Sequence, residues 1–175
     1  MSTLKVGTIQ DHANSITALT IDSSGRVNQP AKPAFRARSD PSSNTNAALQ
    51  GTIIFNVEDF DIGGDYNVSN GRFTAPVAGI YHFSFDALVA NDISNSALAS
   101  GSSINVHFMK NGAEGNFSHR AYYRIDGAST YNTIYRSDII QLAANDYVTV
   151  YVRSKFIYRD TSGTYDPVFQ GHLVA

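Results

Sequence analysis

Alternating aromatic and polar residues in one short segment constrain the fold of this chain most. Residues 81–86 have the sequence Tyr-His-Phe-Ser-Phe-Asp. Neighbouring side chains of a β-strand point to opposite faces, so this segment predicts a strand with one buried, aromatic face: Tyr81, Phe83 and Phe85. The opposite face of the strand is polar and carries His82, Ser84 and Asp86.

Further alternation and frequent turn signals extend this prediction along the chain. Residues 148–152 alternate in the same way: valines occupy every second position, with Thr149 and Tyr151 between them. Asn-Gly pairs at 70–71 and 111–112 supply the positive backbone φ that tight hairpins need. Many short strands separated by closely spaced turns indicate an all-β sandwich or barrel, and no segment predicts a long helix.

Composition limits the partners of such a domain. Hydrophobic residues make up 42% of the 175 residues and charged residues only 16%, which leaves room for a buried protein interface. The net charge is -2 and the basic residues are scattered, so the sequence predicts no nucleic-acid partner. No run approaches the roughly 18 apolar residues of a membrane helix, which predicts no membrane insertion.

The chain contains no cysteine. Disulfides, zinc–thiolate sites and cysteine nucleophiles are therefore excluded. Secreted domains of this size often carry disulfides, so the absence of cysteine favours an intracellular or viral product. The first residues begin no apolar segment, and we therefore expect no signal peptide there.

Two prolines that lie close together, Pro30 and Pro33, mark the predicted domain boundary. Proline interrupts strand pairing and stiffens a connection. Residues 1–30 are therefore predicted to form a short extended N-terminal arm, and residues 31–175 to form the head domain.

The alternating segment is part of a longer pattern of spaced residues. Residues 79–85 read Gly-Ile-Tyr-His-Phe-Ser-Phe, and the earlier members of the pattern are Phe55, Asp61, Tyr66 and Phe73. The pattern resembles the signature of the globular head of complement component C1q, a relative of the tumour necrosis factor jelly roll. Further segments resemble strands and turns of that head, so the resemblance covers roughly residues 33–175.

This resemblance implies a jelly-roll β-sandwich of about ten antiparallel strands that assembles as a homotrimer. The predicted structural core consists of signature residues: Phe55, Tyr66, Phe73, Gly79, Tyr81, Phe83 and Phe85. The inner face of each sheet packs against the other sheet, which leaves the polar face of the alternating strand for neighbouring copies. The trimer-interface candidates are therefore His82, Ser84 and Asp86.

The arm has a resemblance of its own. Residues 17–27, Thr-Ala-Leu-Thr-Ile-Asp-Ser-Ser-Gly-Arg-Val, resemble short segments of phage tail-fibre and virion structural proteins. With the absent cysteine, this implies a virion protein: a tail or head fibre, or a capsid decoration. The apolar residues of the arm are candidates for attachment to other virion proteins: Leu4, Val6, Ile9, Ile16, Leu19 and Ile21.

Catalytic and metal-binding patterns are weak in this sequence. No two of the five histidines have the helical spacing of a zinc site: His12, His82, His107, His119 and His172. Residues 59–65 resemble the start of a calcium loop, but Asn70 stands where the loop needs a bidentate glutamate. We therefore expect no catalytic residues, no metal, no cofactor and no enzymatic activity.

Tyrosines are the richest candidates for binding. Their side chains combine apolar area with a hydroxyl group, which suits protein and sugar contacts; the candidates are Tyr122, Tyr123, Tyr131, Tyr135, Tyr158 and Tyr165. Loops 91–103 and 158–165 are predicted to contact a host-surface glycan or protein. The alternative function is a secreted or cell-surface, lectin-like recognition module. Fibre, decoration and receptor binding stay open at this point.

Overall fold

A computed structural model describes residues 4–39, 51–90, 100–113, 120–124, 132–153, 156–158 and 166–175, with backbone only at 90, 120 and 156–158. Every regular element in these ranges is a β-strand, so none of them supplies a helix that could cross a membrane. The all-β prediction is confirmed. Most of loop 91–103 and of loop 158–165, together with His119, Tyr131 and Tyr165, lies outside the described residues.

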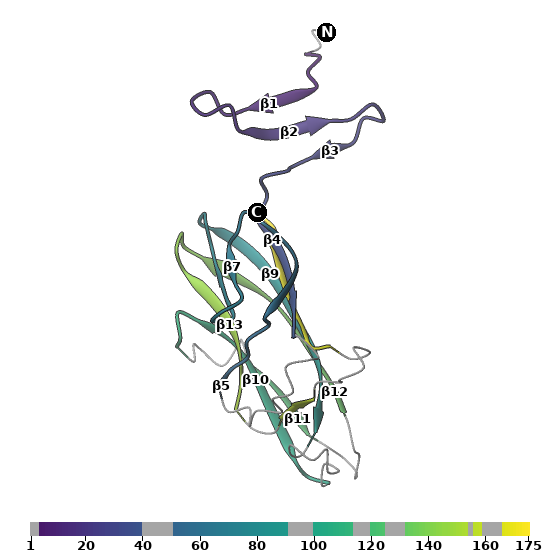
Figure 1. Cartoon of the computed structure of the whole chain (residues 1–175), viewed down its shortest axis with the longest axis vertical. Coiled ribbons are helices and arrows are strands. Elements are labelled where there is room, and N and C mark those ends of the chain that lie inside the picture. The colour runs from purple at the N-terminus through teal and green to yellow at the C-terminus, as the bar shows by residue number, and fades with distance from the viewer. Residues whose placement is uncertain are drawn as a thin grey trace.

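Two sheets pack face to face in the head (Figure 1). We call the first the β10 sheet; its strand order is β11 (Arg120–Arg124), β10 (Ser103–Lys110), β13 (Tyr147–Val152), β8 (Arg72–Thr74) and β7 (Tyr66–Asn67), with β5 (Gly51–Thr52) paired to β13. We call the second the β9 sheet; its order is β12 (Asn132–Leu142), β9 (Gly79–Ala90), β15 (Val168–Leu173), β4 (Ala34–Arg38) and β6 (Val57–Ile62), with β14 (Phe156–Tyr158) paired to β9.

All strand pairs between these elements are antiparallel. The described part of the head holds two six-stranded sheets, more strands than the predicted ten or so. The difference comes from short pieces such as β5 and β7, each of two residues. Strands this short carry too few residues for a visible alternation, so sequence patterns miss them.

The core lies between the two sheets and is mainly aromatic. Phe55, Phe73, Tyr81, Phe83 and Phe85 are completely buried, and Tyr66 is nearly so. The ring of Phe83 lies 5.5 Å from that of Phe73 and 5.9 Å from that of Phe169, measured between centroids. Aromatic pairs at such distances add to the free energy of burial.

Two glycines allow close approaches around β9. Gly79, included in the predicted core, is only half-buried and begins β9; a Cβ there would lie 2.8 Å from the carbonyl oxygen of Ala175. Gly171 of β15 lies directly opposite Phe83, and a Cβ there would lie 2.5 Å from the Phe83 ring. Gly171 therefore makes room for the ring of Phe83 in the core.

A polar turn connects β12 to β13. Asp146 accepts hydrogen bonds from Asn111 Nδ2, Lys110 Nζ and the backbone amide of Ala143, each at 2.7 Å. These donors, Asn111 first, lower the pKa of Asp146 from 3.8 to about 2. Asn111 and Asn145 have the positive φ that such turns need.

Asp146→Asn is expected to reduce the loss of stability in acid. The pKa of Asp146 is lower in the folded than in the unfolded chain, so its contribution is present above pH 3.8 and is lost as the pH falls towards 2. Thermal melts between pH 5 and pH 2 should show a flatter decline for the variant than for the parent. Equal slopes would contradict this role. Asp86→Asn is the control. Burial raises the pKa of Asp86, so removal of this carboxylate should make the decline in acid steeper rather than flatter.

The arm forms a small antiparallel sheet of its own, drawn in purple in Figure 1. Its strands are β1 (Thr8–Gln10), β2 (Thr17–Ile21) and β3 (Val27–Asn28), in that order. The connection to the head is held at Lys32, whose Nζ donates to the carbonyl of Val174, and at Pro33, whose carbonyl accepts from the amide of Leu173. The C-terminus therefore lies at the junction between arm and head (Figure 1).

Candidate functional site

The outward face of the β9 sheet is the face that does not pack on the core. On β9 itself the buried aromatic residues alternate with His82, Ser84 and Asp86, which face away from the core. On β15 their direct partners are His172, Gln170 and Val168. On β12 their direct partners are Ile139, Ser137 and Tyr135. The structure thus brings all three trimer-interface candidates onto one continuous surface.

Large apolar side chains are exposed on this outward face. Tyr135 and Ile139 are 55% and 60% exposed on β12, and Ile80 is 41% exposed on β9. At the other edge, Phe60 and Ile62 of β6 are 48% and 40% exposed. A grouped set of exposed apolar residues marks an interaction surface far better than a single one does.

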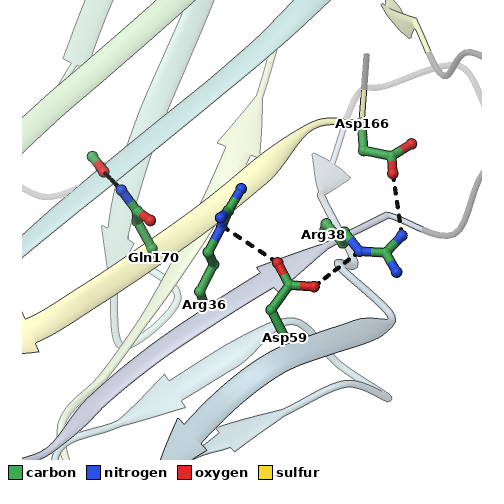
Figure 2. Close-up of polar contacts among 6 residues, drawn as sticks. Arg36, Arg38, Asp59, Asp166 and Gln170 are labelled. Atoms are coloured by element: carbon green, nitrogen blue, oxygen red, sulfur yellow. Dashed lines mark hydrogen bonds and ion pairs between the residues drawn. The ribbon is translucent and has the colours of Figure 1, made fainter. Parts of the chain in front are cut away.

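An ion-pair network occupies the β4–β6 side of the same face (Figure 2). Arg38 Nε donates to Asp59 Oδ1 at 3.0 Å, and its Nη1 donates to Asp166 Oδ2 at 3.1 Å. Arg36 Nε lies 3.4 Å from Asp59 Oδ2. Gln170 Nε2, drawn beside them, donates to Ser84 Oγ at 3.1 Å.

The network depends on an irregularity in strand pairing. Between β4 and β6 the register shifts after Arg36, so Asp59 has no direct partner on β4 and its carboxylate reaches two arginines. These side chains are between 31% and 44% exposed, and ion pairs of this kind contribute roughly 0–1 kcal/mol. These ion pairs hold the charged side chains in fixed orientations on this face. The Asp59 carboxylate is thus held by two arginines.

Titratable groups on this face are already partly shielded from water. Burial raises the pKa of Asp86, and the nearby Arg36 guanidinium opposes that rise. Burial also lowers the pKa of His172, helped by the charges of His82 and Lys32. The imidazole of His82 is fixed by Ser137, whose Oγ lies 2.7 Å from its Nε2.

The arm offers a second surface, with one apolar side. Ile9 lies opposite Leu19, and Ile21 lies opposite Val27, so these four side chains share one face of the small sheet. The other face carries Thr8, Thr20 and Asn28. Among the attachment candidates, Leu4, Ile9, Ile16 and Ile21 are exposed, whereas Val6 and Leu19 are half-buried.

A hollow of about 530 Å³ separates the base of the arm from the head. Its apolar wall includes Pro33, Pro76, Val77 and the last three residues of the chain.

Of the tyrosine candidates, Tyr122 is 62% exposed on β11, and Tyr123 accepts a hydrogen bond from the amide of Tyr135. Tyr123 therefore supports β12 rather than presenting its hydroxyl to a ligand.

Comparison with known proteins decides the family. A sequence model of the C1q domain matches residues 34–174, which span every strand of the head. The chain belongs to the C1q domain family. The resemblance inferred from the signature residues is confirmed.

Solved structures with the same fold support the jelly-roll prediction. The C1q-like head is similar to the globular domain of zebrafish complement 1qA protein, with a TM-score of 0.57 and 18% identity over 82% of this chain and 98% of that one. It is also similar to murine APRIL, with a TM-score of 0.53 and 12% identity over 79% of this chain and 98% of that one. No curated protein matches the sequence. The jelly-roll fold is therefore confirmed.

Proposed function

We propose that this chain is a non-enzymatic virion structural protein that displays a trimeric C1q-like head and joins the particle through its arm. The observation that carries the proposal is the outward face of the β9 sheet. That face groups exposed Ile80, Tyr135 and Ile139 with polar groups already held in place. Domains of the C1q and tumour necrosis factor type usually form trimers, which supports a trimeric head here.

Three copies that cover this face would keep its two arginines paired. Arg36 and Arg38 are already paired with Asp59 and Asp166, so their burial does not isolate a charge. Burial of exposed apolar surface is the main favourable contribution to association. The head would thus bring three arms together at one end of the assembly.

The arm supports the virion part of the proposal. Its sheet has an apolar face, and a short isolated sheet of this size is marginally stable in water. Its Thr-Ala-Leu-Thr-Ile-Asp-Ser-Ser-Gly-Arg-Val segment resembles virion proteins, and the chain has no cysteine. A host-surface glycan or protein would then meet the head near exposed tyrosines such as Tyr122.

Ile139→Asp is expected to separate the trimer into folded monomers. A carboxylate at this exposed site leaves the core untouched but would have to lose its water at the interface. Light scattering should give three chains per particle for the parent and one for the variant, with unchanged circular dichroism. Val77→Asp is the matched control, because Val77 is 47% exposed and lies in the turn before β9.

Two results would overturn the trimer. One is a parent chain that stays monomeric at micromolar concentration. The other is an Ile139→Asp variant that keeps three chains per particle. A secreted or cell-surface recognition module, the alternative function, would still trimerise but would be absent from purified particles.

A further inference from the structure

We infer that His82 and His172 form a chelating site for a divalent transition-metal ion, with Zn²⁺ as the representative. Imidazole nitrogen is a preferred ligand of Zn²⁺, Ni²⁺ and Cu²⁺, whereas Mg²⁺ and Ca²⁺ prefer oxygen. The site lies within one chain, on the outward face of the β9 sheet. Both ligands belong to one chain, so the site does not depend on the trimer or the virion role, although the proposed trimer would cover the same face.

The two histidines are direct partners in the antiparallel pair of β9 and β15. Residues opposite each other in such a pair have Cβ atoms about 4.5–5.5 Å apart and point to the same side of the sheet. The two imidazole centroids are 5.3 Å apart, and the ring planes are inclined by 50°. Two adjacent strands of the jelly roll thus hold the two rings next to each other.

This separation fits a shared tetrahedral metal ion. A Zn–N bond is about 2.0–2.1 Å long, which puts each ring centroid about 3.2 Å from the ion. Two such rings at a tetrahedral angle have centroids about 5.2 Å apart. The observed separation of 5.3 Å matches this spacing.

The orientation of the His82 ring also suits metal binding. His82 Nε2 lies 2.7 Å from Ser137 Oγ. A hydrogen bond from one ring nitrogen to such a neighbour fixes the ring and leaves the other nitrogen to bind the ion.

Space for the remaining ligands is present next to the rings. A hollow of about 300 Å³ is bordered by His82, His172, Gln170 and Phe60. Water molecules in this hollow can complete the coordination that two histidines leave open. Lys32 contributes a positive charge nearby, so we expect binding weaker than that of a four-ligand structural site.

The test is a calorimetric titration of the full chain with ZnCl₂ at pH 7.5, after treatment with a chelator. We expect one ion per chain for the parent, and at least a tenfold loss of affinity in either His82→Gln or His172→Gln. Ser137→Ala should weaken binding less than either histidine change. His12→Gln, an exposed histidine of the arm, is the matched control and should bind like the parent. Mg²⁺ should not compete.

Electron paramagnetic resonance with Cu²⁺ gives an independent readout, because two imidazoles produce a two-nitrogen coupling pattern. Light scattering and melting curves of the same samples show whether a variant has lost its fold or its trimer. No binding by the parent, or unchanged binding by both glutamine variants, would overturn the site. Loss of binding in variants that remain folded supports it whether or not the chain is trimeric.

Discussion

Phe83→Ala is expected to lower the free energy of unfolding by about 3–5 kcal/mol. Phe83 is completely buried, and its ring lies among those of Phe73, Phe108 and Phe169 at centroid distances of 5.5, 6.1 and 5.9 Å. Removal of the ring leaves a cavity that two hydrogen-bonded sheets cannot close by small movements. Urea unfolding and thermal melts measure the loss, which is a large fraction of a typical domain's stability.

Two further variants make this prediction specific. Tyr122→Ala removes an aromatic ring that is 62% exposed and should change stability by less than about 0.5 kcal/mol. Gly171→Ala should destabilise the parent, because its new Cβ meets the Phe83 ring at 2.5 Å, but should cost less when Phe83 is already alanine. If Phe83→Ala melts within a few degrees of the parent, the assigned core is wrong.

Deletion of residues 1–30 is expected to abolish particle incorporation while leaving the head folded and trimeric. Among the described residues, the strands of the arm pair only with one another, and the chain reaches its first hydrogen bonds to the head at Lys32 and Pro33. The melting temperature of the truncated head should therefore match that of the parent. Quantitative mass spectrometry of purified particles measures incorporation.

Single substitutions on the two faces of the arm sharpen this test. Ile21→Asp places a charge on the apolar face and should reduce incorporation strongly. Thr20→Asp places the same charge on the opposite, polar face and should have little effect. Normal incorporation of the truncated chain would instead assign attachment to the head.

Local patterns predicted much of the head, because burial on a strand alternates with every residue. Phe83 and Phe85 could be assigned to the core from residues 81–86 alone, and the all-β class followed from the turns between such segments. The arm was predicted only as a short extended segment, whereas the structure has three paired strands there. β1 and β3 are too short and too polar to show alternation by themselves.

The candidate sites needed information that lies in strand pairing. Arg36, Arg38 and Asp59 form their network only because the β4–β6 register shifts between Arg36 and Ala37. His82 and His172 are far apart in the chain, and a search for helical spacing misses a pair that two adjacent strands bring together. A comparison of histidines on strands predicted to be neighbours is the signal that finds this pair.

The position of the C-terminus determines where the chain tolerates an added sequence. The carbonyl of Ala175 accepts a hydrogen bond from the amide of Ile80, and Val174 is tied to Lys32 at the base of the arm. A tag or cargo fused after Ala175 would leave through the space between arm and head and push them apart. The described chain starts at the far tip of the arm (Figure 1), so a fusion before it keeps clear of the head but occupies the end nearest the proposed attachment. Neither of these two ends is therefore a neutral place for an affinity tag.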